Sequence, residues 1–247
     1  KVYRLAELVL DVPSLIQRLT ELSGESLAMA AQIEPLHDGN GLSGLTVNGR
    51  PIQAQRTVLC AGAGNAALLK ALGLAQPAQQ LRPLHMVLAK GPALKPLYAH
   101  CLGGGPKPRV TVTTHPAADG QWVWYLGGDL AEADGVARDD AAQIKAAQQE
   151  MADLLPWVDQ SQTRWATLRV DRAEPAQSGL VRPDNAFLAD QGRLLVGWPT
   201  KLALSPDLSD RVLAALQRDG IQPGSDHRRP DLPCPPLGRP VWDALLP

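Results

Sequence analysis

The sequence has little of what marks a secreted, membrane-spanning or nucleic-acid-binding protein. Its 247 residues include only three cysteines, and 24 basic residues nearly balance 25 acidic ones. Three widely spaced cysteines form neither a disulfide framework nor a zinc motif, so we expect a reducing, cytoplasmic environment. No apolar run approaches the roughly 20 residues of a membrane span, and no basic stripe indicates a nucleic-acid partner.

The chain also lacks a starting methionine, a signal peptide and a metal motif. It opens on Lys1, and residues 1–13 have no uninterrupted apolar core behind a basic start. We therefore expect a fragment of a longer protein. Three histidines, His85, His100 and His115, lack the paired spacing of metal ligands. We expect no metal site, and we interpret His85 as a core residue.

Local patterns in the first part of the chain predict mixed secondary structure. Residues 5–10 read as a strand or an extended entry, and apolar residues at helical spacing predict a helix over 12–22. Further on, the dipeptide Asn48-Gly49 predicts a type I′ hairpin.

Two segments have the pattern of a buried strand, a turn and a helix. Residues 57–73, TVLCAGAGNAALLKALG, are the first, and residues 193–218 are the second. We expect Ser205 to be the N-cap of the second helix, because a proline follows it in the first turn.

Strand patterns dominate the middle of the chain. The stretches LHMVLAK, RVTVTTH and QWVWYL predict strands, and turn residues between the last two predict a hairpin. A helix is predicted over 139–155, and a further strand over 163–175. From residue 221 onward the chain is rich in proline, which predicts a tail that is packed as irregular coil or is partly disordered.

These patterns predict an α/β (α+β) protein with two domains, of which the first is discontinuous. The first domain comprises residues 1–78 and 181–220, the strand-rich domain residues 79–180, and the proline-rich tail residues 221–247.

The glycine turn in 57–73 fulfils only part of a dinucleotide-binding fingerprint. Gly62, Gly64 and Ala67 spell G-x-G-x-x-A between a strand and a helix. The acidic residue that would bind the ribose about 20 positions later is missing, since residues 74–96 contain no Asp or Glu. The turn alone therefore does not predict a pyrophosphate loop.

Several motifs, in their order, resemble a known enzyme family. The segments are RTVLCAGAGNAALLKALGL, LRPLHMVLAKGP, WVWYLGGDLAE, LLPWVD, WATLRVDRAEP and RLLVGWPTKLALSPDLSDRVLAAL. This order is similar to that of the D-amino-acid oxidase/glycine oxidase-like family of FAD-dependent oxidoreductases, over roughly residues 1–218. The family's N-terminal G-x-G-x-x-G and its ribose-binding acid are absent from this sequence.

The resemblance implies a fold, a cofactor and a reaction. It implies a partial FAD/NAD(P)-binding Rossmann-like domain and an antiparallel-sheet substrate domain. With FAD, such an enzyme oxidises a small amine or amino-acid-like carboxylate substrate by hydride transfer to the flavin. The implied cofactor-binding residues are Ala61, Gly62, Gly64, Gly197, Thr200, Lys201 and Leu202. Lys201 stands where the family usually has glycine.

One arginine is a candidate for the substrate site. In the segment WATLR, Arg169 resembles the glycine oxidase arginine that binds the substrate carboxylate, a task that suits a planar guanidinium. The same role is open to Arg164, Arg172 or Arg182, and Arg169 can instead form a structural ion pair. The sequence identifies no catalytic residue.

Two other functions stay open at this point. The chain can be a catalytically silent domain that binds a ligand or a partner, which the missing pyrophosphate loop favours. It can also be a nicotinamide-dependent dehydrogenase that uses the turn from Gly62 to Ala67. We expect a small-molecule substrate as the partner, and the oligomeric state is left open.

Overall fold

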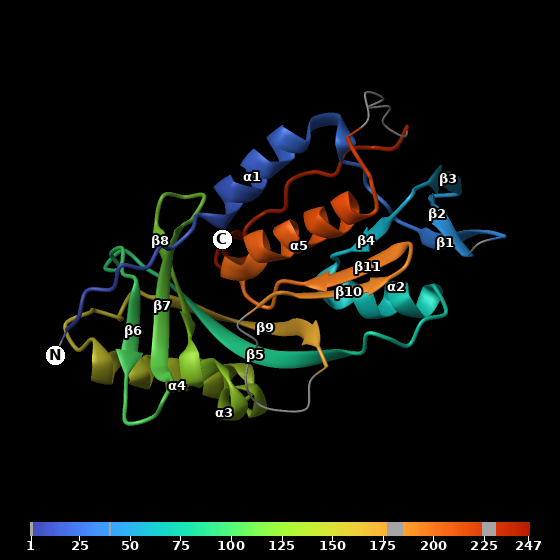
Figure 1. Ribbon diagram of the computed structural model, residues 1–247. Coiled ribbons are helices and arrows are strands. Elements are labelled where there is room, and N and C mark those ends of the chain that lie inside the picture. The colour runs from blue at the N-terminus through green and yellow to red at the C-terminus, as the bar shows by residue number, and fades with distance from the viewer. Residues whose placement is uncertain (1, 40, 177–184, 224–230) are drawn as a thin grey trace. The chain divides into compact units, whose positions relative to one another are not determined.

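The computed structural model describes residues 2–39, 41–176, 185–223 and 231–247 (Figure 1). The chain divides into two compact units. We call residues 1–22, 83–170 and 236–247 the strand-rich unit, and residues 23–82 and 171–235 the α/β unit.

This division differs from the predicted domains at both ends of the chain. Residues 1–22 and 236–247 group with the strand-rich unit, whereas we predicted a first domain from residue 1 and a separate tail. Side-chain contacts explain the grouping, because His100 lies 3.5 Å from Glu7 and Lys90 bonds the carbonyl of Leu246. The predicted boundary between 180 and 181 lies outside the described residues.

The strand-rich unit is organised by a five-stranded sheet of order β6-β7-β8-β5-β9. The pairs β6–β7, β7–β8 and β5–β8 are antiparallel, which confirms the predicted antiparallel sheet. The strands are β5 (Gln79–Lys90), β6 (Ala99–Leu102), β7 (Pro108–Pro116), β8 (Trp122–Gly127) and β9 (Arg164–Pro175). The predicted hairpin joins β7 to β8.

Helix α4 (Asp140–Leu154) packs on one face of this sheet (Figure 1). Its Ala147 and Met151 belong to the same buried cluster as Val110 and Leu126 of the strands. The helix begins where predicted, since the Asp139 carboxylate accepts the N–H of Ala142 at 2.8 Å and caps it. A short helix, α3 (Ala133–Ala137), precedes it.

The end of the chain is more ordered than predicted. A short helix, α6 (Val241–Leu245), lies in the segment that we expected to be coil. Leu246 is buried, and the Lys90 ammonium, itself 1% exposed, donates to the Leu246 carbonyl at 2.7 Å. A buried charge must be paired, and Lys90 also meets the Asp119 carboxylate at 2.8 Å.

The α/β unit contains two small sheets. One is antiparallel, with β1 (Ile33–Asp38), β2 (Gly41–Val47) and β3 (Arg50–Gln53) in that order. Its β2–β3 turn has positive φ angles at Asn48 and Gly49, as a type I′ hairpin requires, so that prediction is confirmed. The other sheet has the order β10-β11-β4.

The β10-β11-β4 sheet combines both kinds of strand pairing. β10 (Phe187–Gln191) is antiparallel to β11 (Leu194–Trp198), and β11 is parallel to β4 (Thr57–Leu59). Every residue of β11 is buried, as expected for a strand covered on both faces.

The helices that follow β4 and β11 complete both predicted strand–turn–helix segments. They are α2 (Asn65–Ala71) and α5 (Ser205–Arg218). The expected N-cap was wrong by one residue, since Leu204 is the N-cap of α5 and Ser205 is its first helical residue. A proline near the start of α5 fixes the backbone there, so the serine side chain is not needed as a cap.

The N-terminal segment is helical but exposed. Helix α1 (Val12–Ser23) confirms the predicted helix, yet each of its residues is at least partly exposed within the described part of the chain. Of the two alternatives expected over 5–10, a strand is not formed, because those residues have no strand partner there, and Leu8 is 89% exposed. In the described ranges, no helix is long and apolar enough to cross a membrane.

Candidate functional site

The carboxyl ends of β4 and β11 lie side by side. The parallel register pairs Leu194 with Thr57 and Val196 with Leu59, so the chain leaves the sheet at the same edge after each of these two strands. Each strand then enters a short turn and a helix. In open α/β sheets, this edge is where ligands bind, because backbone groups and helix starts converge there.

The first turn, between β4 and α2, exposes its backbone. Gly62 has a φ of +57°, a conformation that other residues rarely adopt. The residues Gly62–Gly64 form one turn of 3-10 helix, in which the N–H of Gly64 bonds the carbonyl of Ala61 at 2.9 Å. Ala61, Ala63 and Gly64 are exposed, so a ligand can approach this backbone closely.

Asn65, the first residue of α2, ties this turn to β11. Its side chain is fully buried. The Oδ1 atom accepts the N–H of Ala61 at 2.8 Å, and the Nδ2 atom donates to the carbonyl of Gly197 at 3.2 Å. One amide therefore fixes the backbone at the ends of both strands. The sequence offered a signal for this residue, since asparagine at a helix start often bonds backbone groups.

Trp198, the last residue of β11, makes a second hydrogen bond between the two segments, this time from β11 to the first turn. The side chain, 1% exposed, packs with Leu59 and Leu69 in the buried cluster of this unit. Its indole N–H donates to the carbonyl of Gly62 at 3.1 Å. The two turns are thus held together by a side chain from each.

The second turn contains an unusual backbone conformation at Thr200. Its φ is +62°, which is an outlier for a β-branched residue. The N–H of Lys201 bonds the carbonyl of Pro199 at 2.7 Å, so residues 199–201 form a γ-turn centred on Thr200. Strained backbone of this kind clusters at functional sites. Lys201 and Leu202, which follow, are exposed.

Gly197 has a packing role at the end of β11. A Cβ atom there would lie 2.8 Å from a methyl carbon of Leu208 in α5. Glycine thus lets α5 pack closely against the strand.

Cys60 lies close to Gly197. Burial raises the pKa of the Cys60 thiol, which keeps the thiol protonated near neutral pH.

The groups at this edge fit a flavin nucleotide in part. Gln79, at the start of β5, donates from Nε2 to the carbonyl of Ala63 at 3.2 Å. Its Oε1 is buried and has no hydrogen-bond partner among the described residues. Such an acceptor suits a hydroxyl or imide N–H of the cofactor. The start of α5 and the Lys201 charge suit its anionic groups.

Arg169 lies in the other unit, on β9. Its guanidinium donates to the carbonyl of Val136 at 3.0 Å and to that of Arg138 at 2.6 Å. It thereby binds the carbonyl end of α3, where a cation is favoured. The side chain is exposed. Of the alternatives, Arg164 binds the carbonyl of Pro247, and Arg182 lies outside the described residues.

His85 is fully buried in the strand-rich unit. Its Nδ1 donates to the carbonyl of Gly135 at 2.9 Å, and its Nε2 lies 3.1 Å from a carboxylate oxygen of Asp140. These contacts are those of a core histidine that joins β5 to α3 and α4. Among the described residues, no group of three histidine, cysteine or acidic side chains could hold a metal ion.

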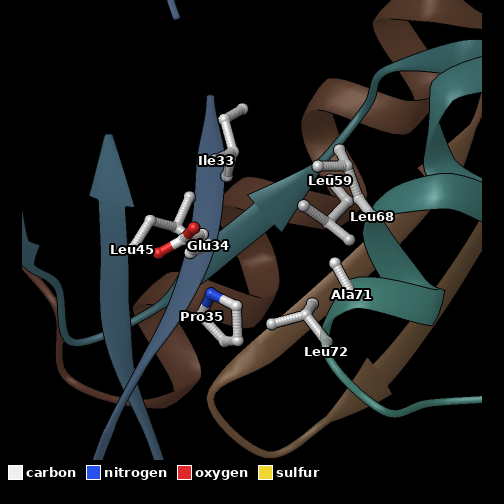
Figure 2. A pocket seen from close by; sticks show the side chains of 8 residues that line it. All are labelled: Ile33, Glu34, Pro35, Leu45, Leu59, Leu68, Ala71 and Leu72. Carbon is white, nitrogen blue, oxygen red and sulfur yellow. The ribbon is translucent and has the colours of Figure 1, made fainter. Parts of the chain in front are cut away.

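A separate apolar pocket lies in the α/β unit, between the β1-β2 hairpin and α2 (Figure 2). Figure 2 shows Leu59, Leu68 and Leu72 facing Ile33 and Pro35 across it. Its volume of about 10 Å³ leaves room for about one water molecule, so it cannot hold a cofactor.

Comparison with known proteins places the chain in a family. No protein-family model matches it. It is 68% identical over 246 residues to the probable FAD-dependent oxidoreductase PA4991 of Pseudomonas aeruginosa. The alignment covers 100% of this chain and 63% of that protein, so the chain spans less than two thirds of its relative.

Solved structures agree with this relationship. The crystal structure of PA4991 matches with a TM-score of 0.94, over 98% of this chain and 67% of that one. An L-amino acid deaminase from Proteus vulgaris has a TM-score of 0.50 at 15% identity, over 78% of this chain and 46% of that one, which shows a shared fold alone. The chain therefore belongs to the same family as PA4991, a protein that is named as an FAD-dependent oxidoreductase.

Proposed function

We propose that this chain forms part of an FAD-dependent oxidoreductase acting on a small amine or amino-acid-like carboxylate substrate. The observation that carries the proposal is the paired edge of β4 and β11, where Asn65 and Trp198 hold two exposed turns together. The relationship to PA4991, which is named as a probable FAD-dependent oxidoreductase, supports the choice of cofactor.

In this proposal the first turn contacts the cofactor through its backbone. The exposed peptide groups of Ala61 and Gly64, with Gly62 at positive φ between them, leave room for a ligand to lie against the chain. The pyrophosphate loop and the ribose-binding acid of the family are absent here. The additional length of the relative would supply them.

The second turn contacts an anionic edge of the cofactor. Thr200, Lys201 and Leu202 present backbone at the start of α5, a helix of 14 residues whose N-terminus carries partial positive charge. Gly197 keeps that helix close to the strand. When bound, FAD accepts a hydride from the substrate, and positive charge beside it favours the negative charge that it then carries.

Arg169 is the proposed ligand of the substrate carboxylate. A guanidinium has five N–H donors, and both of its terminal nitrogens already bind carbonyl groups of residues 136 and 138. These bonds fix the orientation of the guanidinium while donors remain for a carboxylate. We also propose a cytoplasmic location, which the three free cysteines support.

The test of the cofactor is a visible absorption spectrum of the purified protein, before and after incubation with FAD and gel filtration. We expect a flavin spectrum that elutes with the protein and is released as FAD on denaturation. A protein that stays colourless after incubation would show that this chain alone does not bind FAD, and the proposal would then hold only for the longer protein. Failure to bind FAD even with the additional length restored contradicts the proposal and favours a catalytically silent domain. Binding of NADH in place of FAD would indicate a nicotinamide-dependent enzyme.

The test of the substrate ligand compares an amino acid with the amine that lacks its carboxylate. Arg169→Lys keeps the charge but loses the planar fork, so we expect the KM for the amino acid to rise about tenfold while the KM for the amine stays the same. An equal effect on both substrates, together with a lower Tm, would assign Arg169 to the α3 contact only.

A further inference from the structure

We propose that Gln79 contacts the bound cofactor and accepts a hydrogen bond from one of its hydroxyl or N–H groups. This inference rests on the proposed function. Neither the sequence motifs nor the relatives assign a role to Gln79. It is the first residue of β5, and its side chain contacts the first turn at Ala63.

The orientation of the Gln79 amide is fixed by its surroundings. A carbonyl oxygen can only accept a hydrogen bond, so the nitrogen of the amide must face the carbonyl of Ala63, 3.2 Å away. The oxygen, Oε1, then points to the other side. It is buried and has no hydrogen-bond partner in the parts of the chain that the structure describes.

An unsatisfied buried acceptor is costly for a protein. Leaving such a group without a donor lowers stability, and native proteins keep few of them. The amide nitrogens of Gln79 and of its neighbour Gln80 both have partners, since Gln80 donates to the buried carboxylate of Glu174 at 2.7 Å. Among the described residues, Gln79 has a buried oxygen without a partner, whereas Gln80 has no such atom. We take the Oε1 of Gln79 to be available for a donor from outside the chain.

The position identifies the ligand that would supply this donor. Gln79 is anchored to Ala63, between Gly62 and Gly64, in the turn where we place the cofactor. A flavin nucleotide offers two kinds of donor, the imide N–H or ribityl hydroxyls of its flavin half and the ribose hydroxyls of its adenosine half. Both have the chemistry that a neutral amide oxygen accepts.

The experiment compares Gln79→Met with Gln80→Met in the purified protein, measuring the FAD dissociation constant and the Tm without FAD. We expect Gln79→Met to weaken FAD binding about tenfold, as loss of one hydrogen bond to a ligand does. Its Tm without FAD should stay close to that of the wild type, because removal of the unsatisfied acceptor offsets the loss of the bond to the carbonyl of Ala63, a residue that is exposed to water. Gln80→Met should lower the Tm and leave FAD binding unchanged.

Two outcomes of this comparison overturn the inference. One is an unchanged FAD dissociation constant in Gln79→Met. The other is weaker binding together with a fall in Tm as large as that of Gln80→Met, which would make Gln79 a structural residue. Failure of the wild-type chain to bind FAD at all would instead refute FAD binding by this chain alone, and the same two variants are then compared in the longer protein.

Binding of half-molecules identifies the donor. Riboflavin and ADP are titrated against the wild type and Gln79→Met. Weaker riboflavin binding in the variant assigns the contact to the flavin half, and weaker ADP binding assigns it to the adenosine half. If neither ligand loses affinity, the contact does not exist.

Discussion

Lys90 in the strand-rich unit and Asn65 in the α/β unit are both buried polar side chains, but they hold different kinds of structure together. Lys90 bonds the carbonyl of Leu246 and the carboxylate of Asp119, which fastens the end of the chain and a hairpin turn to the core. Asn65 bonds the backbone of Ala61 in the first turn and of the buried Gly197 at the end of β11, and residues of both turns that follow these strands remain exposed.

The difference extends to other polar side chains of each unit. In the strand-rich unit, the buried His85 and Gln143 bond the segment around α3 and join it to β5. In the α/β unit, Gln79 has an unsatisfied acceptor and Thr200 has a strained φ. A strained φ and an unsatisfied acceptor thus lie beside the two turns, as expected where a site is prepared for a ligand. An unsatisfied group is not unique to the α/β unit, since the buried hydroxyl of Thr163 in the strand-rich unit also has no hydrogen-bond partner among the described residues.

The largest effect on stability should come from Lys90→Met. The change removes a charged donor that satisfies a buried carbonyl, so we expect a loss of about 3 kcal/mol in the free energy of unfolding. Urea denaturation measures it, with the exposed Lys95→Met as control. A loss as small as that of the control would show that Lys90 does not hold the C-terminal segment.

Asn65→Leu should combine a smaller loss of stability with a loss of cofactor binding. The substitution leaves the N–H of Ala61 and the buried carbonyl of Gly197 without partners, which costs about 2 kcal/mol. FAD affinity should fall in addition, whereas Lys90→Met should leave it nearly unchanged. Equal affinity in the two variants would remove the functional difference between the units.

Gly197→Ala tests the close packing of α5. The added Cβ would lie 2.8 Å from a methyl carbon of buried Leu208, so we expect a cost of about 1 to 2 kcal/mol from overpacking. Leu208→Ala in the same chain should relieve part of this cost. Gly238→Ala, where a Cβ meets open space, is the matched control in the strand-rich unit.

Thr200→Gly should act in the opposite direction and stabilise the α/β unit. Glycine adopts the φ of +62° without strain, and we expect a gain of about 1 kcal/mol despite the greater freedom of the unfolded chain. Thr200→Ser keeps a Cβ at this φ, so it should gain nothing. Urea denaturation of both variants separates backbone strain from loss of the side chain.

The smallest expected effect on stability is the pH dependence of the contact between Lys90 and Asp119. The hydrogen bond from Lys90 lowers the pKa of Asp119, so the carboxylate favours the folded state above its unfolded pKa of about 4. This contribution is lost as the pH falls through the lower, folded pKa. Asp119→Asn should therefore be less stable than the wild type at pH 7, and the gap should close at strongly acidic pH.

Much of the local structure could be predicted because it depends on neighbouring residues. The strand–turn–helix segments, the Asn48-Gly49 hairpin and the helix over 139–155 were recognisable from residue type and spacing. Residues 5–10, expected as a strand or an extended entry, form no strand because their apolar residues find no strand to pair with in the described chain. A strand needs a partner that the local sequence does not specify.

The candidate site could be predicted only as two separate turns. Their junction depends on the parallel pairing of β4 with β11, strands that are far apart in the sequence. The amide of Asn65 and the indole of Trp198 meet their partners only after that pairing. The role of Gln79 had no signal at all, because an unsatisfied acceptor exists only in three dimensions.

Hydrogen–deuterium exchange of the purified protein, with and without FAD, tests most directly whether the two turns form one site. The amides of residues 61–64 and 200–204 are the ones to follow. We predict that FAD slows exchange in both segments together, and that Asn65→Leu abolishes the effect in both. Binding of FAD with protection of only one segment, or of neither, would contradict a single site at the edge of β4 and β11.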